Sequence, residues 1–217
     1  MTDAEIILRF HDLYYRRGFE QTGAWGLKRW MGVPVLKCPM DMIVYQELLH
    51  LIRPQLIIET GTRHGGSALF FAHLCDLIGA GEIVTVDVER PADLPSHPRI
   101  TYLTGSSTDP AIVQQVRDRA EGKSPVFVVL DSDHKASHVL EEMRLYHALV
   151  TPGSFMVVED TNVNGHPTFI EHGPGPMEAI AEFAKENGDF EIDHSCEMHL
   201  ITMHPNGWLR RKGYHSC

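Results

Sequence analysis

The chain has 217 residues, 43% of them hydrophobic, and its 19 basic and 29 acidic residues give a formal charge of −10. This length predicts one globular unit with a sizeable core. The acidic charge argues against a nucleic acid or an anionic membrane as partner, since both attract basic surfaces. The apolar runs are far shorter than the ~20 residues of a membrane helix, the first residues lack a signal-peptide pattern, and the scattered cysteines indicate a reducing compartment. We therefore expect a cytoplasmic protein.

The N-terminal part of the chain is predicted to form a short helical annex. Thr2 and Glu5 have the spacing of a capping box, so we expect a helix from there to about Arg17. Glycines and tryptophans predict a loop over residues 18–32. A second helix is expected to begin at Pro39, because proline suits the first turn of a helix.

From residue 55 onward, short apolar runs alternate with helical patterns, which is typical of a mostly parallel sheet covered by helices on both faces. We therefore separate an annex of residues 1–54 from a main domain of residues 55–217. The last two predicted strands are too close together for a crossover helix, so they indicate an antiparallel hairpin at one edge. The predicted strands are 56–58, 82–86, 99–103, 126–130, 155–158, 190–192 and 198–203. The predicted helices are 67–78, 108–121, 136–149 and 176–187.

Acidic residues follow four of these strands. In chain order they are Glu59, Asp87, Asp131 with Asp133, and Glu159 with Asp160. The carboxyl ends of parallel strands meet at one edge of a sheet, where open α/β sheets bind their ligands. We therefore expect these carboxylates to share one rim, where something cationic must offset their mutual repulsion.

The first of these acids begins a glycine-containing turn, E-T-G-T-R-H-G-G-S, at residues 59–67. Glycines allow a tight turn and a close approach of a ligand to the backbone, and Asp87 is placed to accept hydrogen bonds from ribose hydroxyls. Arg63 stands where a dinucleotide fingerprint needs its middle glycine, and Glu59 would repel a phosphate. The turn therefore favours a nucleoside ligand with a positive charge, such as an amino group or a sulfonium. An ordinary strand-to-helix turn is the alternative.

Two neighbouring strand ends, D-S-D-H at 131–134 and E-D at 159–160, carry the oxygen ligands that hard divalent cations prefer. Three of these carboxylates could hold Mg²⁺ with positions left for a substrate that has two neighbouring oxygens, and the ion would lower the pKa of a substrate hydroxyl. The alternative for Asp131 or Asp133 is that it caps the helix that follows. A carboxylate-rich set favours Mg²⁺ or Mn²⁺ over zinc.

Three of the 14 histidines are candidates for a role in the site, because they lie in loops above the same rim. His134 is a candidate general base, and His166 and His172 are candidates for substrate contact. Most of the other histidines must be ordinary surface or core residues.

Five motifs together resemble the cephalosporin-hydroxylase-like family, which also contains rhamnosyl O-methyltransferases. They are G-V-P with K-C-P (32–39), E-T-G-T with G-G-S-A (59–68), L-D-S-D-H (130–134), V-E-D-T-N-V-N-G-H-P (158–167) and H-G-P-G-P (172–176). The likeness extends over residues 30–210. It implies a Rossmann-like class I methyltransferase that uses S-adenosylmethionine, with an α/β fold built on a seven-stranded sheet, mostly parallel with an antiparallel edge.

The resemblance also implies roles for individual residues. It assigns Mg²⁺ to Asp133, Glu159 and Asp160, with Asp131 close by, and it places Asp87 on the ribose. Asp133 and His134 are the expected catalytic residues. The resemblance and the pattern of the turn together give the expected cofactor-binding residues, which are Glu59, Gly61, Arg63, Gly65, Gly66, Ser67, Asp87 and Asp131.

The expected function is a Mg²⁺-dependent O-methyltransferase that acts on a hydroxyl of a small natural product or sugar. The alternative is a non-catalytic S-adenosylmethionine-binding partner of a separate oxygenase, which could tolerate the loss of the metal-binding acids. A nicotinamide-dependent oxidoreductase is a weaker alternative, because Arg63 replaces the middle glycine of its fingerprint and because the sheet ends in a hairpin. A metal-dependent hydrolase is weaker still, because it leaves the glycine turn without a role. We also expect a homo-oligomer, in which Phe10, Tyr14 and Tyr15 of the annex helix pack on a second subunit.

Overall fold

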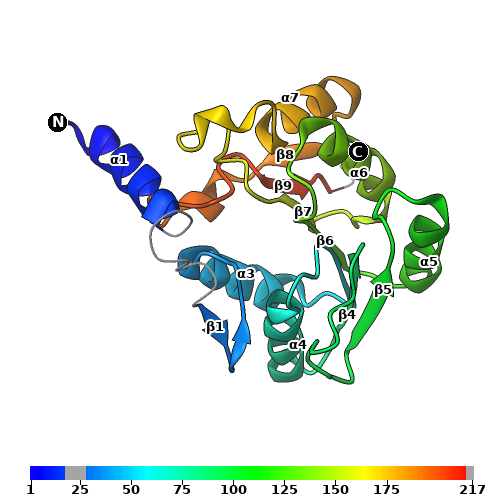
Figure 1. Ribbon diagram of the computed structural model, residues 1–217. Helices are drawn as coiled ribbons and strands as arrows, with labels where there is room; N and C mark the ends of the chain where they lie inside the picture. Colours follow the sequence, from blue (N-terminus) through cyan, green and yellow to red (C-terminus); the bar gives the residue numbers. More distant parts are fainter. Residues whose placement is uncertain (18–27, 214–217) are drawn as a thin grey trace.

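Seven strands form one sheet in the order β5-β4-β3-β6-β7-β9-β8 in the computed structural model, which describes residues 1–17 and 28–213 (Figure 1). Strands β3 to β7 run parallel, and β9 pairs antiparallel with both β7 and β8. This arrangement confirms the predicted mostly parallel sheet with an antiparallel edge. The strands are β3 Leu56–Thr60, β4 Glu82–Asp87, β5 Ile100–Thr104, β6 Val126–Leu130, β7 Phe155–Val158, β8 Phe190–Ile192 and β9 Trp208–Arg211.

Helices cover both faces of this sheet. Successive residues of a strand point to opposite faces, so each strand packs against helices on both sides. In β3, Leu56 and Ile58 pack with α5, α6 and α7, whereas Ile57 packs with α3 and α4 on the other face. The helices are α1 Asp3–Arg16, α3 Pro39–Ile52, α4 Gly66–Ile78, α5 Pro110–Ala120, α6 Ala136–Tyr146 and α7 Pro176–Glu186, with short 3₁₀ turns at η2 His147–Leu149, η3 Ile170–His172 and η4 His194–Glu197. Among the described residues, none of these helices is long and apolar enough to cross a bilayer.

The N-terminal helix α1 stands out from the body of the molecule and contacts it through a few buried residues (Figure 1). Its predicted capping box is confirmed, because Glu5 N donates to Thr2 Oγ1 and Thr2 N donates to Glu5 Oε2. His11 and Tyr15 are its buried residues, which corrects the expectation that Tyr15 is exposed, while Phe10 is 48% exposed. Packing on a second subunit stays a prediction.

His11 joins α1 to the loop that follows β7. Its Nε2 lies 3.0 Å from Asn162 Nδ2, and in the neighbouring contact Thr168 Oγ1 donates to Asp12 Oδ1 at 3.0 Å. Burial lowers the pKa of His11 from 6.5 to about 4, against the opposing charge of Asp12. The imidazole is therefore neutral at pH 7 and accepts the hydrogen bond from the Asn162 amide.

We expect acid to weaken this attachment before it unfolds the sheet. The pKa of His11 is lower in the folded state than in the unfolded state. The folded state therefore keeps its full stability above pH 6.5, the ordinary pKa, and loses stability as the pH falls toward about 4. At pH 5 the loss is on the order of 2 kcal/mol. Hydrogen exchange of the α1 amides at pH 7 and pH 5 measures it, with His11→Gln as the non-titrating control. Equal pH dependence in both proteins would contradict the prediction.

A short hairpin lies inside the segment that the sequence predicts as a loop. Strands β1 (Arg29–Trp30) and β2 (Val33–Pro34) pair antiparallel around Met31 and Gly32. Both turn residues have positive φ, at 48° and 88°, as two-residue hairpin turns require. Residues 18–27 of the predicted loop lie outside the described residues.

The predicted strand at 198–203 is wrong, and the last strand of the sheet is Trp208–Arg211. Only the end of the 198–203 segment is buried, at Ile201 and Met203, and Met203 N donates to Asp41 Oδ2 of α3 at 2.9 Å. The segment is therefore as apolar as a strand, but its backbone does not pair with a neighbouring strand. The two arginines of β9 hide the true strand, since an alternating apolar pattern is absent there.

The boundary between residues 54 and 55 stays a prediction. Helix α3, which lies before it, contributes Val44, Tyr45 and Leu49 to the same buried cluster as Ile57 of β3. The second half of the predicted annex thus shares its core with the sheet.

Candidate functional site

A cavity of about 910 Å³ opens at the carboxyl ends of the parallel strands. Residues after each of the strands β3 to β7 line it. From the predicted set these are Gly61, Arg63, Gly66, Ser67, Asp87, Asp131, Asp133, His134 and Asp160, together with His172. The cavity has the size of a site for a cofactor and a substrate side by side.

Two glycines of the turn after β3 are required by the packing of backbone against backbone. Gly61 has φ +92°, and a Cβ there would lie 1.8 Å from the carbonyl oxygen of Asp131. A Cβ on Gly66 would lie 2.0 Å from the carbonyl oxygen of Pro34 in β2. The sequence interpretation, in which the glycines allow a tight turn and the approach of a ligand, is therefore incomplete. These glycines also let the end of β3 approach the end of β6 and let α4 approach the hairpin.

The carboxylate of Asp87, at the end of β4, is held in place by backbone donors. Arg63 N donates to Asp87 Oδ2 at 2.8 Å, and Glu89 N donates to Asp87 Oδ1 at 3.1 Å. Asp87 also lines the cavity. Each of its oxygens keeps a lone pair for a further donor, so the residue is prepared to accept hydrogen bonds from a ligand's hydroxyl groups.

Glu59 lies behind the cavity wall rather than in it. Its side chain is fully buried, and Oε2 accepts from Thr85 Oγ1 at 2.6 Å. Burial raises the pKa of Glu59 to about 7, although the charge of Lys37 and the hydrogen bonds from Ser67 and Thr85 oppose the shift. Glu59 is thus a buried support of the turn and does not line the cavity. Gly65, which lies beside Pro95 and Tyr102, is also not among the lining residues.

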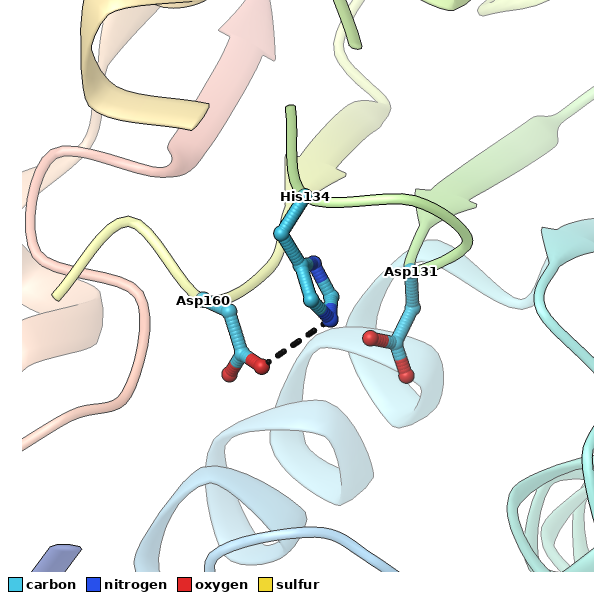
Figure 2. A group of neighbouring side chains, drawn as sticks. All are labelled: Asp131, His134 and Asp160. Atoms are coloured by element: carbon cyan, nitrogen blue, oxygen red, sulfur yellow. Dashed lines mark ion pairs between the residues drawn. The ribbon is translucent and has the colours of Figure 1, made fainter. Parts of the chain in front are cut away.

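Asp131, His134 and Asp160 converge where the chain leaves β6 and β7 (Figure 2). One potential ligand atom from each lies within 4.8 Å of the others, and His134 Nε2 is 3.3 Å from Asp160 Oδ2. Burial alone would lower the pKa of His134, but the nearby carboxylates, that of Asp160 first, outweigh it and raise the pKa. We call these three residues the rim group. Two carboxylates and an imidazole that face a cavity fit a hard divalent ion with open positions.

Lys37 lies beside the rim group, and the sequence pattern alone does not predict a chemical role for it. Its Nζ is 2.6 Å from both Asp131 Oδ2 and Glu159 Oε1. Burial alone would lower the pKa of Lys37, but these two carboxylates raise it. The cation expected to offset the repulsion at the rim is therefore supplied in part by the chain itself. The K-C-P motif was the available signal for it.

The structure does not gather the expected ligand set Asp133, Glu159 and Asp160. Asp133 Oδ1 accepts from Lys135 N at 3.1 Å, in a turn just before α6, and its side chain is 47% exposed. Glu159 is directed inward to Lys37 and to Tyr45, whose OH donates to Oε1 at 2.6 Å. Of the three, Asp160 alone belongs to the rim group. Asp133 thus lies outside the rim group, and it does not cap α6 either, because the N-cap of that helix is Lys135 and no side chain makes a capping bond there. Its role as a metal ligand stays a prediction.

His166 and His172, the two histidines expected to contact the substrate, differ in whether they face the cavity. His172 lines the cavity, but His166 contacts Glu178 Oε1 at 2.8 Å and is not among the lining residues. Glu178 also accepts from Asn164 Nδ2 and Gly175 N. Burial opposes the shift, yet these donors lower the pKa of Glu178 to about 2. His166 thus fastens a loop to the first turn of α7.

Aromatic and aliphatic side chains that the sequence analysis did not assign to the site complete the cavity wall. Tyr15 comes from α1, Leu36 from the segment before α3, and Val163 and Phe169 from the loop after β7. Phe169 has φ +48°, and its ring lies 5.5 Å from that of His172. A bulky residue in the left-handed region at a cavity wall is typical of a functional constraint.

The chain is similar to known proteins over most of its length. The family described as rhamnosyl O-methyltransferase/CmcI matches residues 23–212. A curated rhamnosyl O-methyltransferase of Mycobacterium leprae (strain TN) is 41% identical over 205 residues, which covers 91% of this chain and 89% of the relative. One of Mycobacterium tuberculosis (strain ATCC 25618 / H37Rv) is 40% identical over 204 residues, with 91% and 83% covered.

Solved structures show the fold. The "CmcI-N160 apo-structure" has a TM-score of 0.67 at 22% identity and covers 87% of this chain and 77% of its own. The "cmcI-D160 Mg-SAM" structure has a TM-score of 0.65 at 21% identity, with 86% and 77% covered. The O-methyltransferase TomG from Streptomyces achromogenes, in complex with SAM, has a TM-score of 0.57 at 19% identity, with 98% and 100% covered. The fold is that of the Rossmann-like methyltransferases, and the chain belongs to the rhamnosyl O-methyltransferase/CmcI family.

Proposed function

We propose that the protein is an S-adenosylmethionine-dependent O-methyltransferase that acts on a hydroxyl of a sugar or small natural product with the help of Mg²⁺. The observation that carries this proposal is one cavity with two chemically different ends. Asp87 lies at one end and the rim group at the other, with the Gly61 turn between them, since Gly61 packs against the carbonyl oxygen of Asp131. The names of the curated relatives and the Mg-SAM complex of a structural neighbour support it.

The nucleoside end binds and orients the methyl donor. Asp87 accepts hydrogen bonds from the ribose hydroxyls, since its carboxylate is already fixed by Arg63 N and Glu89 N. The backbone at Gly61 and Gly66 and the Ser67 side chain form the adjacent wall. The donor supplies a methyl group on a sulfonium, and the acidic rim favours that positive charge.

The rim end binds the acceptor hydroxyl. Asp131 and Asp160 would hold the metal ion, which when bound lowers the pKa of a coordinated hydroxyl. His134, with Nε2 beside Asp160 Oδ2, is placed to take the acceptor's proton. The acceptor oxygen forms the new bond to the methyl carbon, the carbon–sulfur bond breaks, and S-adenosylhomocysteine leaves. Tyr15, Leu36 and Phe169 exclude water and position the rest of the acceptor.

Calorimetry separates this proposal from the oxidoreductase alternative. We expect S-adenosylhomocysteine to bind in the micromolar range and NAD to show no binding, since the turn lacks the dinucleotide fingerprint. In a panel of glycosides and phenolic natural products, mass spectrometry should detect a gain of one methyl group, and chelation by EDTA should abolish it. Tight NAD binding, or turnover that survives EDTA, would contradict the proposal or its metal requirement, respectively.

A further inference from the structure

His204 is a buried histidine behind the rim group, and the proposed chemistry does not use it. It lies between the buried Met203 and strand β9, and its side chain is 2% exposed. This part of the chain packs closely on the end of β7, because Val158 N donates to the carbonyl oxygen of Gly207 at 2.9 Å and a Cβ on Gly207 would lie 2.2 Å from the carbonyl oxygen of Val158. The packing brings His204 next to the E-D pair at residues 159–160.

One ring nitrogen of His204 holds the backbone of Asp160. Asp160 N donates to His204 Nδ1 at 3.1 Å. Asp160 has φ +54°, in the left-handed region, which a residue other than glycine keeps only where its surroundings hold it there. One residue further on, Thr161 Oγ1 donates to the carbonyl oxygen of Pro205 at 2.6 Å. The turn that carries the Asp160 carboxylate into the rim group is therefore fastened to the segment 204–207.

The other ring nitrogen of His204 faces the first acid of the pair. Because Nδ1 accepts a hydrogen bond, it carries no proton, and the neutral imidazole bears its proton on Nε2. Nε2 lies 3.6 Å from Glu159 Oε2 and 3.5 Å from Asp41 Oδ2, and it has no hydrogen-bond partner among the described residues. Asp41 is fixed in turn, since Met203 N donates to the same Oδ2. The Nε2–H therefore presents its positive end to two buried carboxylates, and one of them is Glu159.

We propose that His204 is a positioning residue for the metal site, in which Nδ1 fixes the backbone turn of Asp160 and Nε2–H orients the carboxylate of Glu159. The family resemblance makes both acids ligands of Mg²⁺. They are adjacent in the chain, yet Glu159 is buried and Asp160 lines the cavity, so their side chains leave one turn in different directions. A single imidazole contacts both and sets how they lie relative to each other. The inference rests on the proposed function for the presence of a divalent ion.

Direct Mn²⁺ binding to the full chain tests this role, with the electron paramagnetic resonance signal of free Mn²⁺ as the readout. His204→Leu removes both ring nitrogens and should weaken the Mn²⁺ affinity by about tenfold or more, the usual cost of losing a group that orients a metal ligand. His204→Asn keeps an acceptor near the position of Nδ1, and His204→Gln keeps a donor near that of Nε2, so each should recover part of the loss. Trp208→Phe is the matched control. Its ring lies 5.5 Å from that of His204, and the variant loses the hydrogen bond from Nε1 to Thr202 Oγ1, so it disturbs the same buried cluster and should leave the Mn²⁺ Kd unchanged.

A measurement without metal keeps the test informative if His204→Leu fails to fold. In the nitrogen NMR spectrum of the metal-free chain, the imidazole of His204 should be neutral with its proton on Nε2, and the missing signals of His204→Gln assign it. A proton on Nδ1 would overturn the inference, and so would equal Mn²⁺ Kd values in His204→Leu and Trp208→Phe. Either result would leave the proposed function standing, because the wild-type chain would still bind Mn²⁺ and S-adenosylhomocysteine. A wild-type chain that binds no Mn²⁺ would instead contradict the metal requirement of the proposed function, and this inference with it.

Discussion

Replacing Asp160 with Asn should remove nearly all methyl transfer and leave the affinity for S-adenosylhomocysteine almost unchanged. Asp160 belongs to the rim group and contacts His134 through Oδ2, so the variant loses a metal-binding oxygen and the partner of the base together. Asp87, at the other end of the cavity, and the backbone of the Gly61 turn keep their contacts. We expect kcat to fall by about 100-fold or more.

Steady-state kinetics and calorimetry on the same preparation measure this separation. Asp133→Asn is the matched comparison, because Asp133 lines the same cavity and carries the same charge but lies outside the rim group. Its effect on kcat should be far smaller. An equal loss of kcat in the two variants would mean that the expected ligand set with Asp133 was right and that the rim group is not the metal site.

The fold could be predicted because it depends on local patterns. Apolar runs of about five residues, separated by helical patterns, are enough to indicate a parallel sheet, and strands such as Val126–Leu130 agree with the structure to the residue. The strand that could not be predicted is Trp208–Arg211, where pairing with β7 and β8 overrides a polar composition. Sequence patterns report burial, but both the unpaired 198–203 segment and the paired strand β9 contain buried residues, so burial alone does not identify the strand.

The rim could be predicted as acidic, but not which acids face the cavity. Asp131 and Asp133 are two residues apart in one loop, and what distinguishes them is Lys37, 94 residues before Asp131. Similarly, the contact with Glu178 holds His166 away from the cavity, whereas His172 lines it. Both distinctions depend on side chains from distant parts of the chain, which motif spacing does not contain.

Replacing Gly61 with Ala should cost both stability and ligand binding. A Cβ on Gly61 would lie 1.8 Å from the carbonyl oxygen of Asp131, and 2.6 Å from its carbonyl carbon, so backbone rather than a flexible side chain would have to move. The β3 turn and the end of β6 must then separate. We expect the free energy of unfolding to fall by about 4 kcal/mol or more, which is the range of severe core changes.

Gly153→Ala is the control that isolates this clash from backbone strain. Gly153 has φ +83°, close to the +92° of Gly61, but a Cβ there has no atom within 4 Å. Its cost should be about 1–2 kcal/mol, the strain of a left-handed residue alone. Denaturant titration of both variants gives the difference. If the two costs are equal, β3 and β6 can separate freely, and their close approach is not what fixes the site.

The Gly61→Ala variant also links the stability of the turn to the position of the rim group. Asp131 contributes its carbonyl oxygen to the contact with Gly61 and its carboxylate to the rim group and to Lys37. Moving its backbone therefore displaces the carboxylate as well, even though Gly61 itself holds no ion. In protein that remains folded at low temperature, Gly61→Ala should weaken Mn²⁺ binding together with S-adenosylhomocysteine binding, whereas Asp160→Asn weakens Mn²⁺ binding alone. That difference follows because Gly61 joins the two ends of the cavity and Asp160 belongs to one of them.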